Sequence, residues 1–208
     1  MDISLGYACR SNCNFEISDQ KEISQDPFLK DHFIVGNANL SISSNTTDTK
    51  ASIHHHLTVR NGNTLITNAV IAEGCRLFLN GERTMIRNTI VFGTIFMANG
   101  GTVEETSQQG NGHIFMAGTA NLKGAQIETL LLKSIKHARF EDISKVKYLC
   151  IYRDPLKTNF YLQAELKSGN QVHLTDHSHG KQKDPGYSPL IMIETSHQQD
   201  RHSWHETT

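Results

Sequence analysis

The sequence has little net charge, few cysteines and no long apolar run, and each shortage excludes a class of protein. Of its 208 residues 20% are charged and the net charge is −1. The chain therefore has no excess of positive charge with which to bind nucleic acid or an anionic membrane. No apolar stretch approaches the roughly 20 residues that a membrane-spanning helix requires. The N-terminus, MDISLGYACRSNCNF, lacks the basic segment and apolar core of a secretory leader. These features favour a chain that stays inside the cell, is exported without a cleaved leader, or has had its leader removed.

The four cysteines do not form a metal-binding pattern. Cys9 and Cys13 are four positions apart, whereas Cys75 and Cys150 stand alone. A structural metal site usually needs a second pair of ligands at matching spacing. We therefore expect structural or incidental thiols, with a disulfide or a metal clip at Cys9 and Cys13 as the alternative, and no cofactor.

Histidines cluster at two places. Adjacent side chains on a strand point to opposite faces, so within His54–His56 at most His54 and His56 could converge on one metal. A solvated strand edge is the expected reading of that run. The densest group of possible metal ligands lies near the C-terminus and consists of His173, Asp176, His177 and His179. It could chelate a divalent ion, but a solvated, flexible segment is expected there, and no metal site is predicted.

The central part of the chain is repetitive. Asn-Gly occurs at Asn61-Gly62, Asn80-Gly81 and Asn99-Gly100, each 19 positions after the last. A second series of glycines has the same step of 19 and consists of Gly74, Gly93 and Gly112. Each glycine of this second series is followed by a short apolar run: GCRLFLNG, GTIFMANG and GHIFMAG. A fixed period with like residues in the same phase is typical of stacked supersecondary units.

The unit is expected to be a β-coil. Nineteen residues are too few for two packed helices with their turns. Short apolar runs that end in Gly or Asn-Gly are typical of strands followed by tight turns. Ile and Val are frequent in this region and suit a pleated surface. Coils stack about 4.8 Å apart, so roughly five of them make a rod about 24 Å long. The prediction is an all-β protein built on a short parallel β-helix, a β-solenoid of about 19 residues per coil.

The rest of the chain is expected to cover the ends of this rod. The predicted organisation is an N-terminal cap and polar loop over 1–50, the solenoid over 51–153, a C-terminal hairpin or cap over 154–194, and a disordered tail over 195–208. The hairpin is placed at the strand-like runs FYLQAEL and QVHLTD around Ser168-Gly169-Asn170. An open solenoid end exposes unpaired backbone, which is why caps are expected at both ends.

No catalytic centre is predicted. Carboxylates in a solenoid meet only if they share a phase in neighbouring coils, and Glu104 and Asp142 share a phase two coils apart, or about 9.6 Å. That spacing is near the upper end for an inverting glycosidase pair. Lys123 has the same phase between them, so a charge-compensated surface stripe is expected.

Apolar residues occupy both strand faces. At a period of 19, Leu77, Phe96 and Phe115 form one row, while Phe78, Met97 and Met116 form another on the opposite face, which Ile95 and Ile114 share. Only one face can be the solenoid interior, and the sequence does not say which. The other must be covered by a partner or by the N-terminal segment around 28–42. The candidate interaction residues are Phe78, Ile95, Phe96, Met97, Ile114, Phe115 and Met116.

The stretch GTIFMANGGTVEET resembles the AIDA-type repeat of bacterial autotransporter adhesins. Gly100-Gly101-Thr102 matches that family's corner, Asn88-Thr89-Ile90-Val91 matches its second element, and Asn61-Gly62 and Asn80-Gly81 are degenerate corners. The match covers roughly 60–130. The family's leader and translocator barrel are not seen in this sequence. The resemblance implies a right-handed β-helix displayed on a cell surface or secreted, acting in adhesion or aggregation, with heptose on exposed Ser or Thr.

Three classes of function follow from these observations. The first is a non-catalytic surface or interaction protein that acts in adhesion or self-association through the apolar rows, with surface glycans as a further class of partner. The second is an intracellular scaffold or secreted effector that assembles through its solenoid, which the missing leader favours. The third is a polysaccharide-active β-helix enzyme, which would need clustered carboxylates in adjacent coils.

Overall fold

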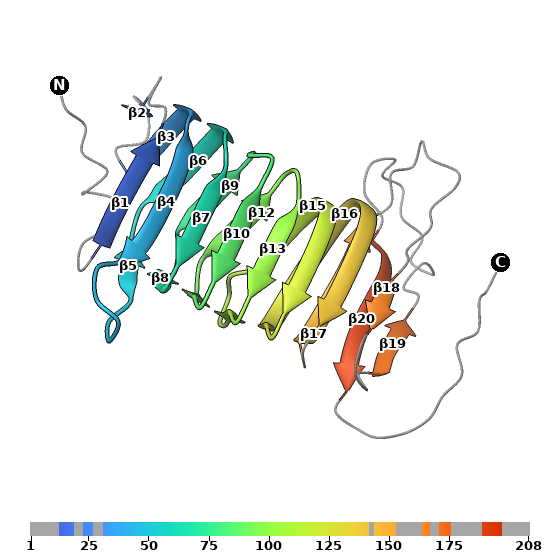
Figure 1. Ribbon diagram of the computed structural model, residues 1–208. Helices are drawn as coiled ribbons and strands as arrows, with labels where there is room; N and C mark the ends of the chain where they lie inside the picture. The colour runs from blue at the N-terminus through green and yellow to red at the C-terminus, as the bar shows by residue number, and fades with distance from the viewer. Residues whose placement is uncertain are drawn as a thin grey trace.

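The computed structural model describes residues 13–18, 23–26, 31–141, 144–152, 164–166, 171–175 and 189–196. Stacked parallel coils of about 19 residues form a β-solenoid of about five turns, and the described residues contain no helix. The coils follow one another along a rod, with the first strands at one end and the last strands at the other (Figure 1). The predicted all-β solenoid is therefore confirmed. Within the described residues, no helix is long and apolar enough to cross a membrane.

Each coil contributes one strand to each of three parallel sheets, which we call faces A, B and C. Face A begins with β3 (His32–Asn37), β6 (His56–Asn61), β9 (Arg76–Leu79) and β12 (Thr94–Met97). Face B begins with β4 (Asn39–Ser44), β7 (Thr64–Thr67), β10 (Thr84–Arg87) and β13 (Gly101–Glu104). Face C begins with β5 (Ala51–Ile53), β8 (Ala69–Ile71), β11 (Ile90–Val91) and β14 (Ser107–Gln108).

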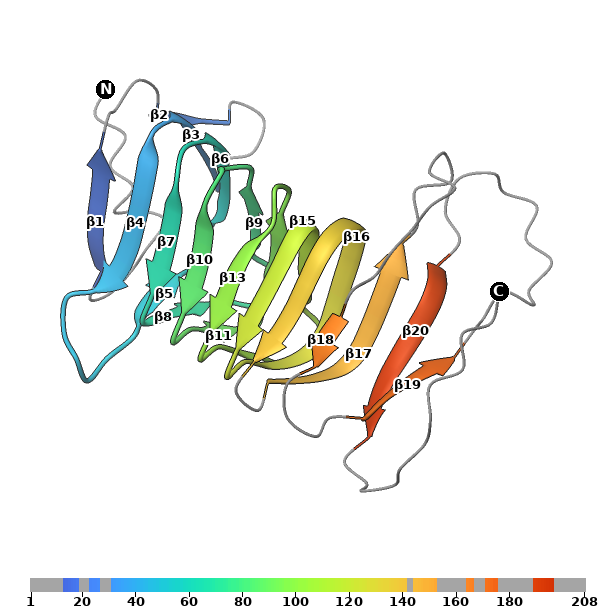
Figure 2. The same cartoon turned by 45° about the vertical axis from the view of Figure 1, so that its right-hand side comes forward.

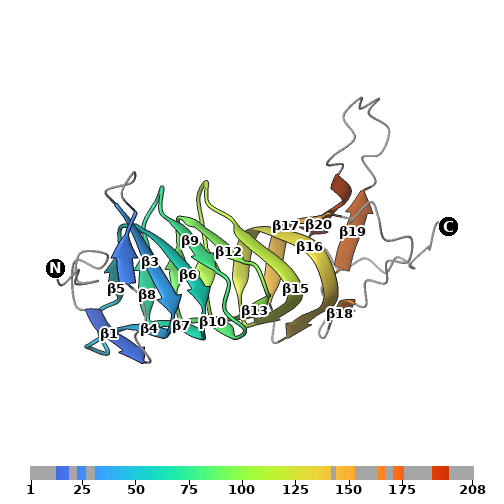
Figure 3. The same ribbon diagram turned by 90° about the horizontal axis from the view of Figure 1, so that it is seen from above.

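In the later coils one continuous strand serves more than one face. The first half of β15 (Ile114–Lys123) pairs with β12 on face A, and its second half pairs with β13 on face B. The long β16 (Gln126–Glu141) passes through faces C, A and B in turn, and β17 (Lys145–Tyr152) passes through faces C and A. Figure 2 shows the face B strands side by side, and Figure 3 shows the strands of face A from above.

The core is a set of stacked rows inside the coils. On face A the row Leu57, Leu77, Ile95, Ile114 and Leu130 is in register from coil to coil and wholly buried. On face C the corresponding row is Ile53, Ile71, Val91, Gln108 and Ile127. Burying each aliphatic side chain contributes about 1.5–3 kcal/mol. The buried amide of Gln108 is satisfied because its Nε2 donates to the Gly112 carbonyl and its Oε1 accepts from the Thr129 N–H, both at 2.7 Å.

Close contact between coils at the corners explains the repeated glycines other than Gly74. A Cβ at Gly81 would overlap the carbonyl oxygen of Gly62, and one at Gly112 would overlap that of Gly93. Glycine is required at these corners because successive coils approach too closely for a side chain. The corner between faces B and C instead stacks left-handed residues with φ of 50°, 45°, 47° and 60°: Asn68, Asn88, Glu105 and Gly124.

The stacking step differs from the predicted constant of 19. Ile95 does pair with Ile114, 19 positions on, but Leu77 pairs with Ile95, 18 positions on, and Leu57 pairs with Leu77, 20 positions on. The step varies because the corner connections differ in length. Residues 72–75 join β8 to β9, whereas only 92–93 join β11 to β12. Phe96 therefore pairs with Phe78 and not, as predicted, with Leu77.

Antiparallel strands cover both ends. At the N-terminal end β1 (Cys13–Ser18) pairs with β4, and β2 (Ile23–Gln25) pairs with β3. Parallel pairing already starts at β3 and β4, inside the range 1–50 that the sequence assigns to a cap and loop. Cys13 is disulfide-bonded, which is the alternative reading of that thiol, and Cys9 lies outside the described residues.

The C-terminal end is closed by a different strand pairing from the one predicted. β20 (Pro189–Ser196) runs antiparallel to both β17 and β19 (Gln171–Thr175). β18 (Ala164–Leu166) adds to β16 as a parallel strand and extends face B. Its partner is therefore the last coil, where the sequence predicted a hairpin with the strand after 168–170.

Candidate functional site

Face A carries a row of aromatic side chains on its outer surface. Side chains alternate along a strand, and because Leu77, Ile95 and Ile114 point inward, the next residue of each strand points outward. We call Phe78, Phe96 and Phe115 the aromatic row. The rings of Phe78 and Phe96 are stacked, with centroids 4.6 Å apart and an interplanar angle of 4°, and those of Phe96 and Phe115 lie 5.8 Å apart. Leu131 continues the row on β16.

The structure separates the seven candidate interaction residues into two groups. The aromatic row is half-buried on the outer surface of face A. The other four, Ile95, Met97, Ile114 and Met116, have no exposed surface and belong to the core. Placing Phe78 on the same face as Met97 and Met116 is therefore wrong. The error arises from the 18-residue step between Leu77 and Ile95, which moves every residue of β9 by one position relative to a constant period of 19.

Basic and imidazole groups border the aromatic row. Arg76 and Arg60 are exposed on face A, and the His113 ring lies edge-on to Phe96 with centroids 6.4 Å apart. Burial lowers the pKa of His113 below the ordinary histidine value of 6.5. The rings of Phe78 and Phe96 pack face to face, so a partner would contact the edges of these rings.

His55 and His56, unlike His54, are packed rather than solvated. His55 Nδ1 lies 3.4 Å from the Asp31 carboxylate, and His56 Nδ1 accepts a 3.0 Å hydrogen bond from the Arg76 backbone N–H. The pKa of His56 is lowered by burial first and then by the nearby charges of His32 and Arg76. Only His54 of the triplet is exposed, so a solvated strand edge describes that residue alone. Among the described residues no group of three His, Cys, Asp or Glu side chains has metal-binding geometry.

The carboxylate considered for hydrolysis is paired with cations. Glu104 lies 3.4 Å from the Lys123 ammonium and 3.6 Å from Arg87, and its side chain is 16% exposed. In backbone register Lys123 stands opposite Glu141 on the next coil, and Asp142 lies outside the described residues. The expected charge-compensated stripe is thus present for Glu104 and its two basic neighbours.

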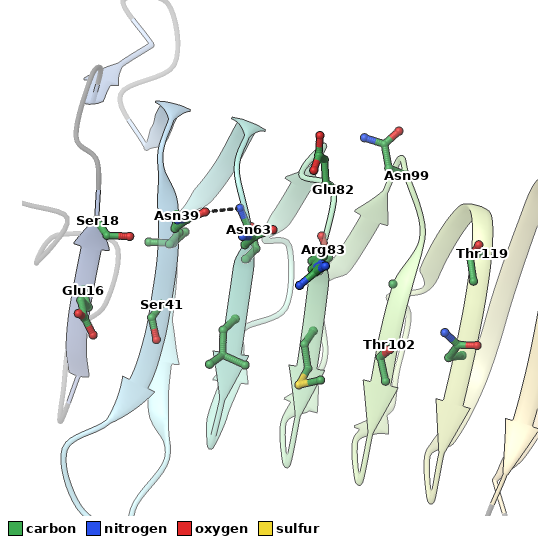
Figure 4. Close-up of a pocket in the computed structure, with 17 residues that line it drawn as sticks. Glu16, Ser18, Asn39, Ser41, Asn63, Glu82, Arg83, Asn99, Thr102 and Thr119 are labelled. Carbon is green, nitrogen blue, oxygen red and sulfur yellow. Dashed lines mark hydrogen bonds between the residues drawn. The ribbon is translucent and has the colours of Figure 1, made fainter.

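A groove runs along face B, and sequence reasoning did not find it. Its volume is about 770 Å³, and it crosses β1, β4, β7, β10, β13 and β15 (Figure 4). Two outward rows line most of it. The first is Asn39, Asn63, Arg83 and Thr119; the second is Ser41, Leu65, Met85, Thr102 and Asn121. The signal in the sequence would have been these rows, but they emerge only when the true steps between coils are known.

The C-terminal ligand cluster is only partly described. His173 lies on β19, and Asp176, His177 and His179 lie outside the described residues.

Comparison with known proteins found no matching family model, no matching curated protein and no matching solved structure.

Proposed function

We propose that the protein is a non-catalytic interaction protein whose solenoids associate side by side through the aromatic row of face A. The observation that carries this proposal is the outward stack of Phe78, Phe96 and Phe115 in the middle of an otherwise regular sheet. A fold needs apolar side chains inside its coils, but it does not need large ones outside. Apolar surface gathered into one patch on a soluble protein usually marks an interaction site.

A second copy of the chain is the partner that the architecture favours. Face A of each copy has the same spacing of about 4.8 Å between strands, so each phenylalanine of one aromatic row can meet one phenylalanine of the other. Growth at the ends is disfavoured because antiparallel strands pair with the terminal coils at both ends. The faces are therefore the surfaces through which rods can join.

Two further considerations support an interaction role. The resemblance to the AIDA-type repeat points to display on a cell surface, where side-by-side association would produce adhesion or aggregation. Glu104, which hydrolysis would require as an acid or base, instead lies 3.6 Å from Arg87 and 3.4 Å from Lys123, and this arrangement is typical of a structural cluster of ion pairs.

The test is the molar mass of wild-type protein and variants by light scattering. Phe96→Glu places a charge in the centre of the row and should reduce an assembled wild type to the 23.3 kDa monomer with its circular dichroism unchanged. The matched control is Phe92→Glu, which makes the same change at an exposed phenylalanine that follows β11 and should leave the assembly intact. A wild type that is monomeric at all concentrations, or an assembly that survives Phe96→Glu, would contradict the proposal.

A further inference from the structure

The outward row of Asn39, Asn63, Arg83 and Thr119 is interrupted at Gly100, a backbone position that cannot carry a side chain. Gly100 precedes β13 and Gly101 begins it, and Arg83 and Thr119 lie on either side of this strand (Figure 4). A Cβ at Gly100 would overlap the Thr119 carbonyl oxygen, and one at Gly101 would overlap the Thr84 carbonyl oxygen. The stacking of the coils therefore excludes a side chain at Gly100, and a side chain at Gly101 would point inward, onto Met97.

The lining of the groove is rich in neutral hydrogen-bonding groups. The outward lining side chains that carry an amide or a hydroxyl are Ser18, Asn39, Ser41, Asn63, Asn99, Thr102, Thr119 and Asn121. Each carboxamide has both donor and acceptor atoms, and each hydroxyl can act as either. In the middle of the groove Leu65 and Met85 stand in register on adjacent strands, each 38% exposed, and form a small apolar platform.

Charge and backbone pairing disfavour two other kinds of linear ligand, a phosphodiester chain and a peptide added as a strand. The ionisable lining residues are Glu16, Glu82 and Arg83, so there is no cationic excess to hold a phosphodiester chain. The central strands β7 and β10 are hydrogen-bonded to parallel neighbours on both sides. An extended peptide therefore cannot join this sheet by strand addition, which requires a free edge.

The remaining ligand class is a hydroxyl-rich, uncharged chain with apolar C–H faces. A linear polysaccharide has these properties, because sugar hydroxyls match amides and hydroxyls while the ring faces pack on aliphatic side chains. The groove crosses six strands, or about 24 Å at a strand spacing of about 4.8 Å. A chain lying along the rod would meet similar groups on successive coils.

We propose that the face B groove binds an unbranched neutral oligosaccharide lengthwise, with its rings over Leu65 and Met85 and its hydroxyls hydrogen-bonded to the flanking amides. This site is on a different face from the aromatic row, and its occupancy does not depend on self-association.

The experiment is a calorimetric titration with unbranched neutral oligosaccharides (the cello-, xylo-, malto- and chito-series) at increasing chain lengths. Wild-type protein should bind one series, with affinity that rises with length until the groove is filled. Thr102→Arg fills the groove with a long charged side chain and should weaken binding by about tenfold or more, which corresponds to about 1.4 kcal/mol. The matched control is Ser107→Arg, which makes a similar change on face C and should leave the affinity unchanged.

Each outcome decides the proposal. Binding that is lost in Thr102→Arg and retained in both Ser107→Arg and Phe96→Glu supports a face B site that is separate from the assembly surface. Absence of binding by every neutral series overturns it. Binding that Thr102→Arg leaves intact, or binding confined to anionic polysaccharides or to peptides tested in parallel, overturns it equally.

Discussion

On its outer surface, face A carries the aromatic row of Phe78, Phe96 and Phe115. The second outward row of face B has Leu65, Met85 and Thr102 instead. The two sheets share the same parallel ladder and the same kind of aliphatic interior. Their outer rows differ because the interior determines whether a coil stacks, and the outer positions are free to vary. Function in this molecule must therefore be sought in the outward rows, because the inward rows report only on the fold.

The largest expected effect on stability is the difference between truncating an inward and an outward side chain of the same strand. Ile95 and Phe96 are adjacent, but Ile95 is wholly buried and Phe96 is not. Ile95→Ala should lower the free energy of unfolding by about 2–5 kcal/mol, because it leaves a cavity in the core. Phe96→Ala should cost about 1 kcal/mol, the contribution of its aromatic pairs. Urea denaturation measures both, and equal losses would contradict the assignment of inner and outer rows.

The next effect is at the corner between faces C and A. Gly112→Ala should destabilise the protein by about 3 kcal/mol or more, because the new Cβ overlaps the Gly93 carbonyl oxygen and the coils must move apart. Gly74→Ala has open space around its Cβ but keeps a φ of +80°, so it should cost about 1–2 kcal/mol. Thermal unfolding of the pair checks the order. If Gly74→Ala proved the more damaging, close coil stacking would not be the reason for the glycines.

Acid should affect face A through two of its histidines. The pKa values of His56 and His113 lie below the unfolded value of 6.5, so the unfolded chain binds protons more readily than the folded chain. The stability that these two neutral rings contribute is therefore present above pH 6.5 and is lost as the pH falls through their lowered folded pKa values. The melting temperature of His56→Gln and of His113→Gln should fall less steeply with acid than that of wild type. Parallel curves for wild type and both variants would show that neither histidine is the cause.

The smallest effect is a gain in stability at the corner between faces B and C. Glu105 adopts a left-handed φ of 47°, whereas the equivalent residues Asn68 and Asn88 are of a type that tolerates this conformation. Glu105→Asn should stabilise the protein by about 0.5–1 kcal/mol. The lost contact with Arg87, 3.4 Å away on the exposed surface, offsets only a few tenths of this. A lower melting temperature for the variant would mean that the ion pair outweighs the backbone strain.

The sequence predicted the solenoid because Gly93 and Gly112, and the Asn-Gly corners, are fixed by backbone contact and recur visibly. It did not predict the register, because loops such as 72–75 change length without leaving a mark on composition. The start of the first coil was missed for the same reason, since Phe33 pairs with Leu57, 24 positions on, across an exposed loop at 45–49.

The unknown register between coils also limited the prediction of the two candidate surfaces. The aromatic residues were visible in sequence, but which of them shared a face depended on a single shortened step between Leu77 and Ile95. The groove on face B was not visible, because its lining combines side chains from different coils, and their register is known only from the three-dimensional stacking. Side-chain rows across coils are long-range features, and a period of 19 approximates them only where the connections have equal lengths.

The antiparallel pairing at the two ends also bears on how the molecule would respond to force. β1 and β20 lie at opposite ends of the rod (Figure 1), so tension applied through them acts along the axis. The hydrogen bonds between coils run in that same direction. A pull of this kind opens the bonds of one coil at a time, as a zipper opens, and does not shear a whole sheet at once. Each coil contacts mainly its neighbours, so the rod would lengthen in successive steps of one coil at low force.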